Sequence, residues 1–439
     1  MDKKSYYFAA NGKGVQLERF ELEMLAFLSQ QKVLTIKQLY KYSCHYKDIS
    51  YNSFRNKIWR WKKYSVVEVK TITLKRRWGN EVSILSIGQN GLRILVSEGY
   101  LPSTWINNDL KTNFTISNYD HYFTTQQVVL DTVLRIKSKG LPIASIRPSQ
   151  LSNLIIDEYE AVIPDWILKC GENKLVFIES DMGTETLGIL ENKVKKYIEL
   201  ARSNPTNKFI VMFVLVDDSL ETQKFYKNNG DKRLANMKKT FLNSNIIHQE
   251  NFALFISHMN RAPLIIDKAM NNDDRASHQL AVTHKILNEI NKHFEYTFIP
   301  ITSSEVYLQD TQKFLYADKV VRMSNLAQSS SFNVLVEYVT EGDMQQLDRL
   351  YHLNQLIQKG LFKQKIDKIV AVYQNIEERE NDNLAAVMGN VLVLDNETLL
   401  KNLDKDPIFF EIISPVKLNP IRLDGMSTLN WTKIIGAAV

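Results

Sequence analysis

The stretch that decides the fold of the N-terminal part is Ser50–Ile87, SYNSFRNKIWRWKKYSVVEVKTITLKRRWGNEVSILSI. Its first part predicts a helix, because Phe54, Ile58 and Trp61 recur at helical spacing. Its second part alternates apolar and polar residues on both sides of Gly79-Asn80, which is typical of two strands joined by a tight turn. We therefore expect a helix followed by a β-hairpin.

The flanking sequence completes this unit. From Gln16 onward, apolar residues follow helical spacing, and a second helix is expected after Thr35, which can cap it. A further helix is expected from Gln89. Three helices, a hairpin and a closing helix, in that order, predict a winged helix-turn-helix over residues 15–100.

Positive charge is concentrated in this unit. Residues 1–110 hold 18 Lys and Arg and 9 Asp and Glu, a net +9, and the whole chain has a net charge of +6, so the remaining 329 residues net −3. Such asymmetry indicates that the basic part meets a polyanion. We expect the following residues to contact double-stranded DNA: Arg55, Lys57, Arg60, Lys62 and Lys63 on the helix, and Lys75, Arg76 and Arg77 at the turn. The alternative is a winged helix used for protein contacts.

The rest of the chain predicts mixed α/β structure. We expect a linker at 101–119, an α/β domain at 120–265, a second at 275–400 and a C-terminal tail at 401–439. Four segments recur in the same order in both domains, which indicates a tandem duplication. The alternative is two unrelated domains that share a strand–helix–strand rhythm. Residues 376–383, IEERENDN, are expected to form an exposed charged loop.

Composition excludes several classes of protein. The two cysteines, Cys44 and Cys170, are too far apart for a CxxC pair, so neither a disulfide framework nor a zinc site is expected. The longest apolar run, Phe209–Val216, suits a buried strand and not a membrane span. We therefore expect a cytoplasmic protein without a membrane segment.

Three carboxylates form the candidate chemical site. Asp165 adjoins one predicted strand, and Glu179 and Asp181 lie two residues apart on the next, so these two point to one face. Carboxylate oxygens are the ligands that Mg²⁺ or Mn²⁺ prefers. Such an ion polarises a phosphodiester and activates water. The sequence therefore predicts a divalent metal site for phosphodiester chemistry at Asp165, Glu179 and Asp181.

The string Pro164-Asp165-Trp166 followed by FIESD at 177–181 resembles the PD-(D/E)XK nuclease pattern, with Asp181 in place of the family's lysine. Lys193, four residues before Tyr197, is a candidate substitute for that lysine. Together with the winged helix and the string ESDMGTE, these residues resemble the MobC or replication-relaxation family of mobile-element proteins. The resemblance implies a restriction-endonuclease-like fold, a divalent metal and nicking at an origin of transfer. It implies double-stranded DNA and conjugation coupling or accessory proteins as partners.

The apparent second copy keeps two acids, Asp318 and Glu337, but has Val339 where the first has Asp181. We therefore interpret it as a degenerate endonuclease-like domain. His121 and His278 recur at the same place in the two copies, and a structural role in the helix is expected for both.

Two classes of function remain open. The leading hypothesis is a metal-dependent relaxase that nicks plasmid or integrative-element DNA. The alternative is a non-catalytic DNA-binding factor for replication, partition or transcription, built on a nuclease-like scaffold. A third reading is a nuclease for defence or repair.

Overall fold

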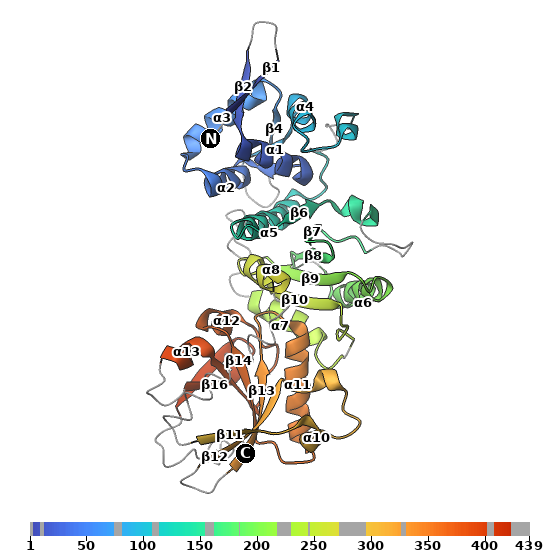
Figure 1. Ribbon diagram of the computed structural model, residues 1–439, viewed down its shortest axis with the longest axis vertical. Helices are drawn as coiled ribbons and strands as arrows, with labels where there is room; N and C mark the ends of the chain where they lie inside the picture. Colours follow the sequence, from blue (N-terminus) through green and yellow to red (C-terminus); the bar gives the residue numbers. More distant parts are fainter. Residues whose placement is uncertain are drawn as a thin grey trace. The chain divides into compact units, whose positions relative to one another are not determined.

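The chain divides into two compact α/β units in the computed structural model (Figure 1). The structure describes residues 3–8, 13–73, 81–107, 114–153, 162–183, 185–216, 230–244, 246–271, 296–325, 331–401 and 408–422. The first unit comprises Met1–Met182, Thr206–Lys227 and His258–Asp267. The second comprises Gly183–Pro205, Asn228–Ser257 and Lys268–Val439.

The first unit begins with a helical region and a small sheet. Its helices are α1 (Arg19–Gln31), α2 (Ile36–Tyr46), α3 (Tyr51–Lys63) and α4 (Gln89–Ser97). Its strands β3 (Leu34–Thr35), β4 (Val67–Thr73) and β5 (Glu81–Ile87) form an antiparallel sheet in the order β3-β5-β4. The predicted cap of α2 is confirmed, since Thr35 Oγ1 accepts the Gln38 N–H at 3.1 Å. The predicted inner face of α3 is confirmed too, because Phe54, Ile58 and Trp61 are buried.

A hairpin that the sequence analysis missed precedes α1. Strands β1 (Lys3–Tyr7) and β2 (Gly14–Glu18) pair antiparallel, so the first helix starts at Arg19 and not near Gln16. Val15 and Leu17 are buried while Gln16 is exposed, which is the alternation of a strand. A Cβ at Gly14 would lie 1.7 Å from the Tyr6 carbonyl oxygen, so this pairing requires glycine.

Two buried acids join the helices of this region. Glu18 and Glu21 are 3% and 2% exposed, and Glu21 Oε2 accepts the Glu18 N–H at 2.8 Å. Lys47, at the end of α2, donates to Glu18 at 2.8 Å, and Lys57 of α3 donates to Glu21. The bond from Lys47 lowers the pKa of the Glu18 carboxyl, although burial opposes this shift. The two buried acids at the start of α1 therefore hold the end of α2 and helix α3 through ion pairs with Lys47 and Lys57.

A sheet flanked by a long helix forms the rest of the first unit. Helix α5 (Tyr119–Lys137) precedes β6 (Ile143–Ile146), β7 (Trp166–Cys170), β8 (Lys174–Asp181) and β9 (Lys208–Leu215). Within the unit the sheet order is β9-β8-β7-β6, with β8 and β9 parallel and the other pairs antiparallel. Short 3₁₀ turns span Ser103–Asn107 and Pro148–Asn153. Helix α8 covers Ala262–Asn271.

The second unit has a seven-stranded sheet whose strands are neighbours in sequence order. These are β11 (Tyr296–Pro300), β12 (Lys319–Asn325), β13 (Ser331–Tyr338), β14 (Lys368–Tyr373), β15 (Val391–Asp395), β16 (Ile408–Ser414) and β17 (Lys417–Arg422). The other elements are α6 (Leu187–Ser203), α7 (Gly230–Thr240), β10 (Phe252–His258), α10 (Ser303–Val306), a 3₁₀ turn at Lys313–Leu315, α11 (Met344–Lys359), α12 (Ile376–Asn381) and α13 (Asn396–Lys401).

The two sheets follow one order of elements. The run β6, β7, β8, α6, β9 has the same sequence of strands and helix as β11, β12, β13, α11, β14. In both runs the first three strands pair antiparallel and the strand after the helix pairs parallel to the third. Three of the four recurring segments lie on corresponding strands: 163–169 with 316–322, 174–185 with 332–343, and 208–216 with 367–375. The fourth pairs the helix segment from His121 with one from His278, which lies outside the described residues.

Two expectations about the C-terminal part differ from the structure. Residues 408–422, expected in a tail, form β16 and β17 of the sheet. Residues 376–381, expected in a loop, form α12, in which Glu378 and Arg379 are buried. Glu378 accepts from Lys268, while Arg379 donates to Asp395 at 2.9 Å and lies 3.7 Å above the Phe410 ring. Glu378 and Arg379 are therefore internal ion-pair partners, while Glu377 and Glu380 are exposed. Among the described residues, no helix is long and apolar enough to cross a membrane.

The buried acid Glu21 predicts a stability effect. Replacing Glu21 with Ala leaves the Lys57 ammonium without its partner, and we expect a loss of about 2 kcal/mol in unfolding free energy. The surface pair of Arg19 and Glu23 supplies a matched control, and Glu23→Ala should cost less than about 0.5 kcal/mol. Urea unfolding followed by tryptophan fluorescence measures both. Equal midpoints for the two variants would contradict the assigned role of Glu21.

Candidate functional site

The outer face of α3 carries four of the eight predicted DNA-binding cations. Arg55, Arg60, Lys62 and Lys63 are exposed, whereas Phe54, Ile58 and Trp61 face the core. The helix begins at an N-cap, Ser50, whose hydroxyl accepts the Ser53 N–H at 3.2 Å. This cap and the apolar face orient the helix so that its cations face outward.

Lys57 lies differently from its neighbours. Its side chain is 29% exposed and its ammonium contacts the buried carboxylate of Glu21. This pairing competes with any phosphate contact, so Lys57 has a structural role that its place in the basic run did not reveal.

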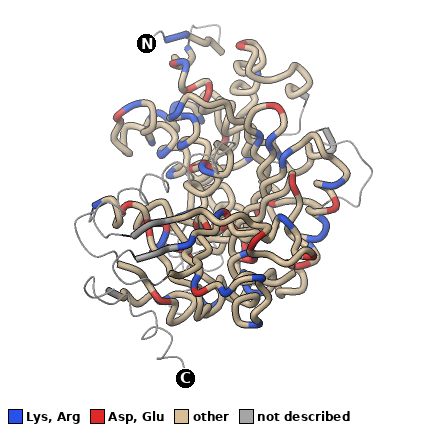
Figure 2. Tube along the Cα trace, turned by 60° about the horizontal axis from the view of Figure 1, so that its bottom comes forward, with Lys and Arg blue, Asp and Glu red and all other residues tan. Residues whose placement is uncertain are grey.

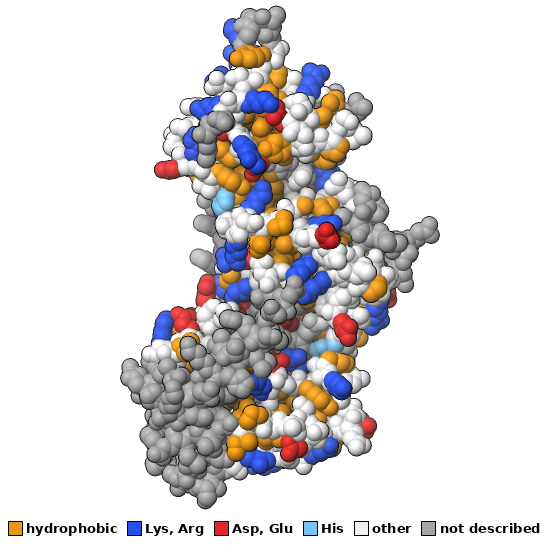
Figure 3. Space-filling model, viewed as in Figure 1, with side chains coloured by type: hydrophobic (Ala, Val, Ile, Leu, Met, Phe, Trp, Pro, Cys, Tyr) orange, Lys and Arg blue, Asp and Glu red, His pale blue; other side chains and the backbone are white. Residues whose placement is uncertain are grey.

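Aromatic side chains accompany the exposed cations of α3. Trp59 is 44% exposed, and the Lys62 ammonium lies 4.9 Å from the centroid of its ring. The Arg55 guanidinium lies 6.0 Å from the Tyr51 ring centroid. Figure 2 marks the Lys and Arg positions along the trace, and Figure 3 shows their side chains spread over the part that contains α1 to α4. Exposed cations beside flat rings suit a phosphate backbone with adjacent sugars and bases.

The predicted basic turn falls outside the described residues. Lys75, Arg76 and Arg77 lie in 74–80, between β4 and β5. The N-terminal hairpin is an additional basic element next to α3, since Arg60 Nη2 donates to the Gly14 carbonyl at 3.3 Å and the rings of Phe8 and Tyr64 lie 6.2 Å apart. Its exposed lysines, Lys3 and Lys4, pair with Glu18 and Glu98.

Asp165 anchors the acidic site of the first unit. Its backbone N–H donates to the Ile178 carbonyl at 3.1 Å, so it extends the pairing of β7 with β8. Its Oδ2 accepts the backbone N–H of Ser180 at 2.7 Å. The carboxylate therefore lies over the end of β8 in a fixed orientation.

His121 contacts the same carboxylate. Its Nε2 lies 3.2 Å from Asp165 Oδ2 and 2.9 Å from the Ser180 carbonyl oxygen. Both partners are acceptors, so Nε2 carries a proton. Burial acts to lower the pKa of His121, but the bond to Asp165 and its charge outweigh this, and the pKa is raised. The cap of α5 is Asn118, which accepts the His121 N–H at 3.2 Å.

His121 reaches the site from α5, far away in the sequence, and its role at Asp165 was missed. The only sequence signal was its recurrence at His278, which lies outside the described residues.

Glu179 and Asp181 point away from α5. The hydroxyl between them, Ser180 Oγ, lies 2.9 Å from Thr125 Oγ1 of α5. Because side chains alternate along a strand, the two acids share the opposite face. They are 2% and 3% exposed. The structure thus brings Asp165 and β8 together and places the two acids of β8 on one buried face, as the spacing predicted.

Lys193 pairs with Glu185 at 2.9 Å within the second unit. The first turn of α6 is capped by Thr186, whose Oγ1 accepts the Ile189 N–H at 3.4 Å, and Glu185 is the ion-pair partner of Lys193. Tyr197 is fully buried in α6 and does not lie on a solvated face.

The three acids are of the right chemical type to bind a divalent metal, but their side chains are not arranged to hold one. Carboxylates at Asp165, Glu179 and Asp181 are hard oxygen donors of the type that Mg²⁺ and Mn²⁺ prefer. Within the described part of the chain, however, no three His, Cys, Asp or Glu side chains are grouped closely enough to hold an ion. Asp165 Oδ2 is directed to Ser180 and His121. A metal site here would require Asp165 to turn.

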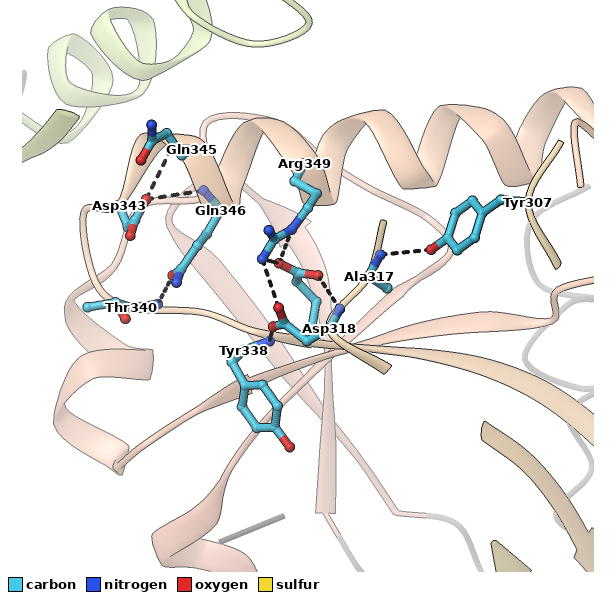
Figure 4. A network of polar contacts seen from close by, with 10 residues as sticks. Tyr307, Ala317, Asp318, Tyr338, Thr340, Asp343, Gln345, Gln346 and Arg349 are labelled. Atoms are coloured by element: carbon cyan, nitrogen blue, oxygen red, sulfur yellow. Dashed lines mark hydrogen bonds and ion pairs between the residues drawn. The ribbon is translucent and has the colours of Figure 1, made fainter. Parts of the chain in front are cut away.

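The second unit holds a related pair of acids (Figure 4). Asp318 Oδ2 accepts the backbone N–H of Tyr338 at 2.8 Å, just as Asp165 accepts that of Ser180. Glu337 precedes Tyr338 as Glu179 precedes Ser180. Here an arginine completes the group, because Arg349 of α11 contacts both Asp318 and Glu337.

Comparisons with known proteins give one family match over part of the chain and one weak structural likeness. No curated protein matches the chain. Among solved structures, the restriction endonuclease FokI aligns at 13% identity over 87% of this chain and 62% of that chain, with a TM-score of 0.16. Residues 25–213, from α1 through most of β9, match the family model described as Replication-relaxation. Over that segment the chain is similar to the replication-relaxation family.

Proposed function

We propose that this protein binds double-stranded DNA through a winged helix-turn-helix, with α3 as the recognition helix and β4–β5 as the wing. The observation that carries the proposal is the exposed face of α3, where four cations and Trp59 lie opposite the buried face. A helix fits the major groove, and cations beside it neutralise phosphates. The family match over residues 25–213 covers most of this element and supports the same function.

We further propose that residues 120–265 and 275–400 are restriction-endonuclease-like copies that arose by tandem duplication. The shared order of strands and helix supports this, and so does the aspartate that accepts a backbone N–H of the neighbouring strand in each. In the first copy, Asp165, Glu179 and Asp181 would hold Mg²⁺ or Mn²⁺. The bound ion would activate water and stabilise the charge on the phosphodiester.

On this basis the specific activity we propose is relaxase-like nicking of mobile-element DNA at an origin of transfer, in the cytoplasm and together with accessory proteins. His121 orients Asp165 through its Nε2 proton, and the buried face of β8 keeps Glu179 and Asp181 away from bulk water. Lys193 is the remaining candidate for the lysine of the nuclease pattern, and it would have to leave Glu185 to act.

The second candidate is a DNA-binding factor that does not cut. One observation favours it specifically: no three ligating groups converge among the described residues, and Asp181 stands where the nuclease pattern has lysine. The DNA-binding proposal is common to both candidates, so the two experiments below address binding and cutting separately.

Binding predicts a distinctive salt dependence. Replacing Arg60 with Ala should weaken duplex binding similarly on all sequences and reduce the slope of log K against log salt by about 1, because one phosphate contact is lost. Fluorescence anisotropy with a labelled duplex at several salt concentrations measures both quantities. Lys365→Ala is the matched control, since this lysine is 80% exposed on the second unit and should not change the slope. Identical slopes for both variants would refute the role of α3.

If the protein cuts DNA through Asp165, a substitution at this residue should affect nicking but not duplex binding. Asp165→Asn keeps an oxygen for the Ser180 N–H but removes the charge, so we expect loss of nicking with duplex binding unchanged. Supercoiled plasmids with and without the native element's intergenic region, incubated with Mg²⁺ or Mn²⁺, report nicking as open circles. Asp131→Asn, at a surface ion pair with Lys41, is the matched control. Binding without nicking by the unaltered chain would favour the second candidate.

A further inference from the structure

The two acidic pairs differ in what faces them. In the first unit Asp165 contacts a neutral backbone amide and His121. In the second, a guanidinium lies against both acids: Arg349 Nη2 is 3.1 Å from Asp318 Oδ1, and Arg349 Nε donates to Glu337 Oε1 at 2.5 Å. The second pair is therefore already bridged by a cation that belongs to the chain (Figure 4).

The Glu337 carboxylate is buried, so it needs the Arg349 guanidinium as a positive partner. Glu337 is 0% exposed, and burial acts to raise the pKa of its carboxyl, while the charge and hydrogen bond of Arg349 act to lower it. A carboxylate in such a place stays charged only beside a positive partner. Burial likewise acts to lower the pKa of Arg349, and the two acids outweigh it, so the guanidinium remains charged.

The arrangement around the pair is fixed on every side. Asp318 uses its second oxygen for the Tyr338 N–H and its own N–H for Glu337 Oε2 at 3.4 Å. Helix α11, which carries Arg349, is capped by Asp343, whose Oδ1 accepts the N–H groups of Gln345 and Gln346 at 3.0 and 3.1 Å. Arg349 thus projects from a helix with a capped N-terminus. It contacts Glu337, which lies on β13, and Asp318, which accepts a backbone N–H of β13.

We propose that Arg349 is a built-in substitute for a divalent cation, which closes the acidic site of the second unit and leaves that unit without a metal-dependent role. One guanidinium satisfies both acids in a planar, forked contact, as a metal would through oxygen coordination. Val339 stands where the first copy has Asp181, so the closed site also has one carboxylate fewer. This inference does not depend on whether the first unit cuts DNA.

Metal binding by the full-length chain tests the proposal. The parent carries Asp165→Asn, Glu179→Gln and Asp181→Asn, so that any ion bound by the first unit is excluded. Adding Arg349→Met should create a site for one Mn²⁺ per chain, measured by calorimetry and electron paramagnetic resonance under mildly alkaline conditions, because a metal binds the deprotonated carboxylates. Adding Glu337→Gln to this variant should remove the site again.

Arg322→Met in the same parent is the matched control. Arg322 lies on β12 and bonds the side chains of Asn333 and Gln364, so its loss uncovers no acid and should create no site. A folded Arg349→Met chain that binds no Mn²⁺ would overturn the proposal.

The parent chain gives a second readout that does not depend on whether Arg349→Met folds. With Arg349 in place, Glu337→Gln should leave Mn²⁺ binding unchanged. If the parent binds Mn²⁺ and Glu337→Gln abolishes that binding, a metal displaces the guanidinium and Arg349 does not close the site. Failure of nicking by the unaltered chain would contradict the proposed function alone, because every chain compared here lacks the acids of the first unit.

Discussion

Each unit depends on an aspartate that accepts a backbone N–H from the neighbouring strand. Asp165 does so at Ser180, and Asp318 does so at Tyr338. This hydrogen bond fixes the aspartate beside the neighbouring strand. On that strand, the residue just before the N–H donor is a buried glutamate, Glu179 in one unit and Glu337 in the other. Such burial of charge is costly unless each carboxylate finds donors or cations. The surrounding polar residues, His121 in one unit and Arg349 in the other, are therefore consequences of where the aspartate lies.

Much of this fold could be predicted from the sequence. The alternation around β4 and β5 and the helical spacing of Phe54, Ile58 and Trp61 reflect local burial, which a sequence records directly. The hairpin β1–β2 was missed because Leu17 and Phe20 also fit a helix, and only the partner strand decides between the two patterns. The strands β16 and β17 were missed because β16 pairs with β15 and β17 pairs with β16, and their own sequence does not mark these pairings.

Only the part of the candidate site that lies on a single strand could be predicted from the sequence. Glu179 and Asp181 share a face by the geometry of a strand, so their placement followed from spacing alone. The contact of His121 with Asp165 joins residues from different elements, and nothing in the local sequence marks it. Lys57 shows the converse difficulty, since it belongs to a basic run and yet its ammonium is held by a buried acid of another helix. Tertiary contacts decided these roles.

Helix α12 shows what such contacts imply for the protein's evolution. Its charged residues have the composition of a solvent-exposed loop, which ordinarily tolerates substitution. Here Glu378 is tied to Lys268, and Arg379 to Asp395 and Phe410, all from other parts of the chain. A change at one member of either pair leaves a buried charge behind, so the partners are expected to vary together among relatives. Within this hydrophilic helix, Glu378 and Arg379 should then diverge more slowly than their exposed neighbours.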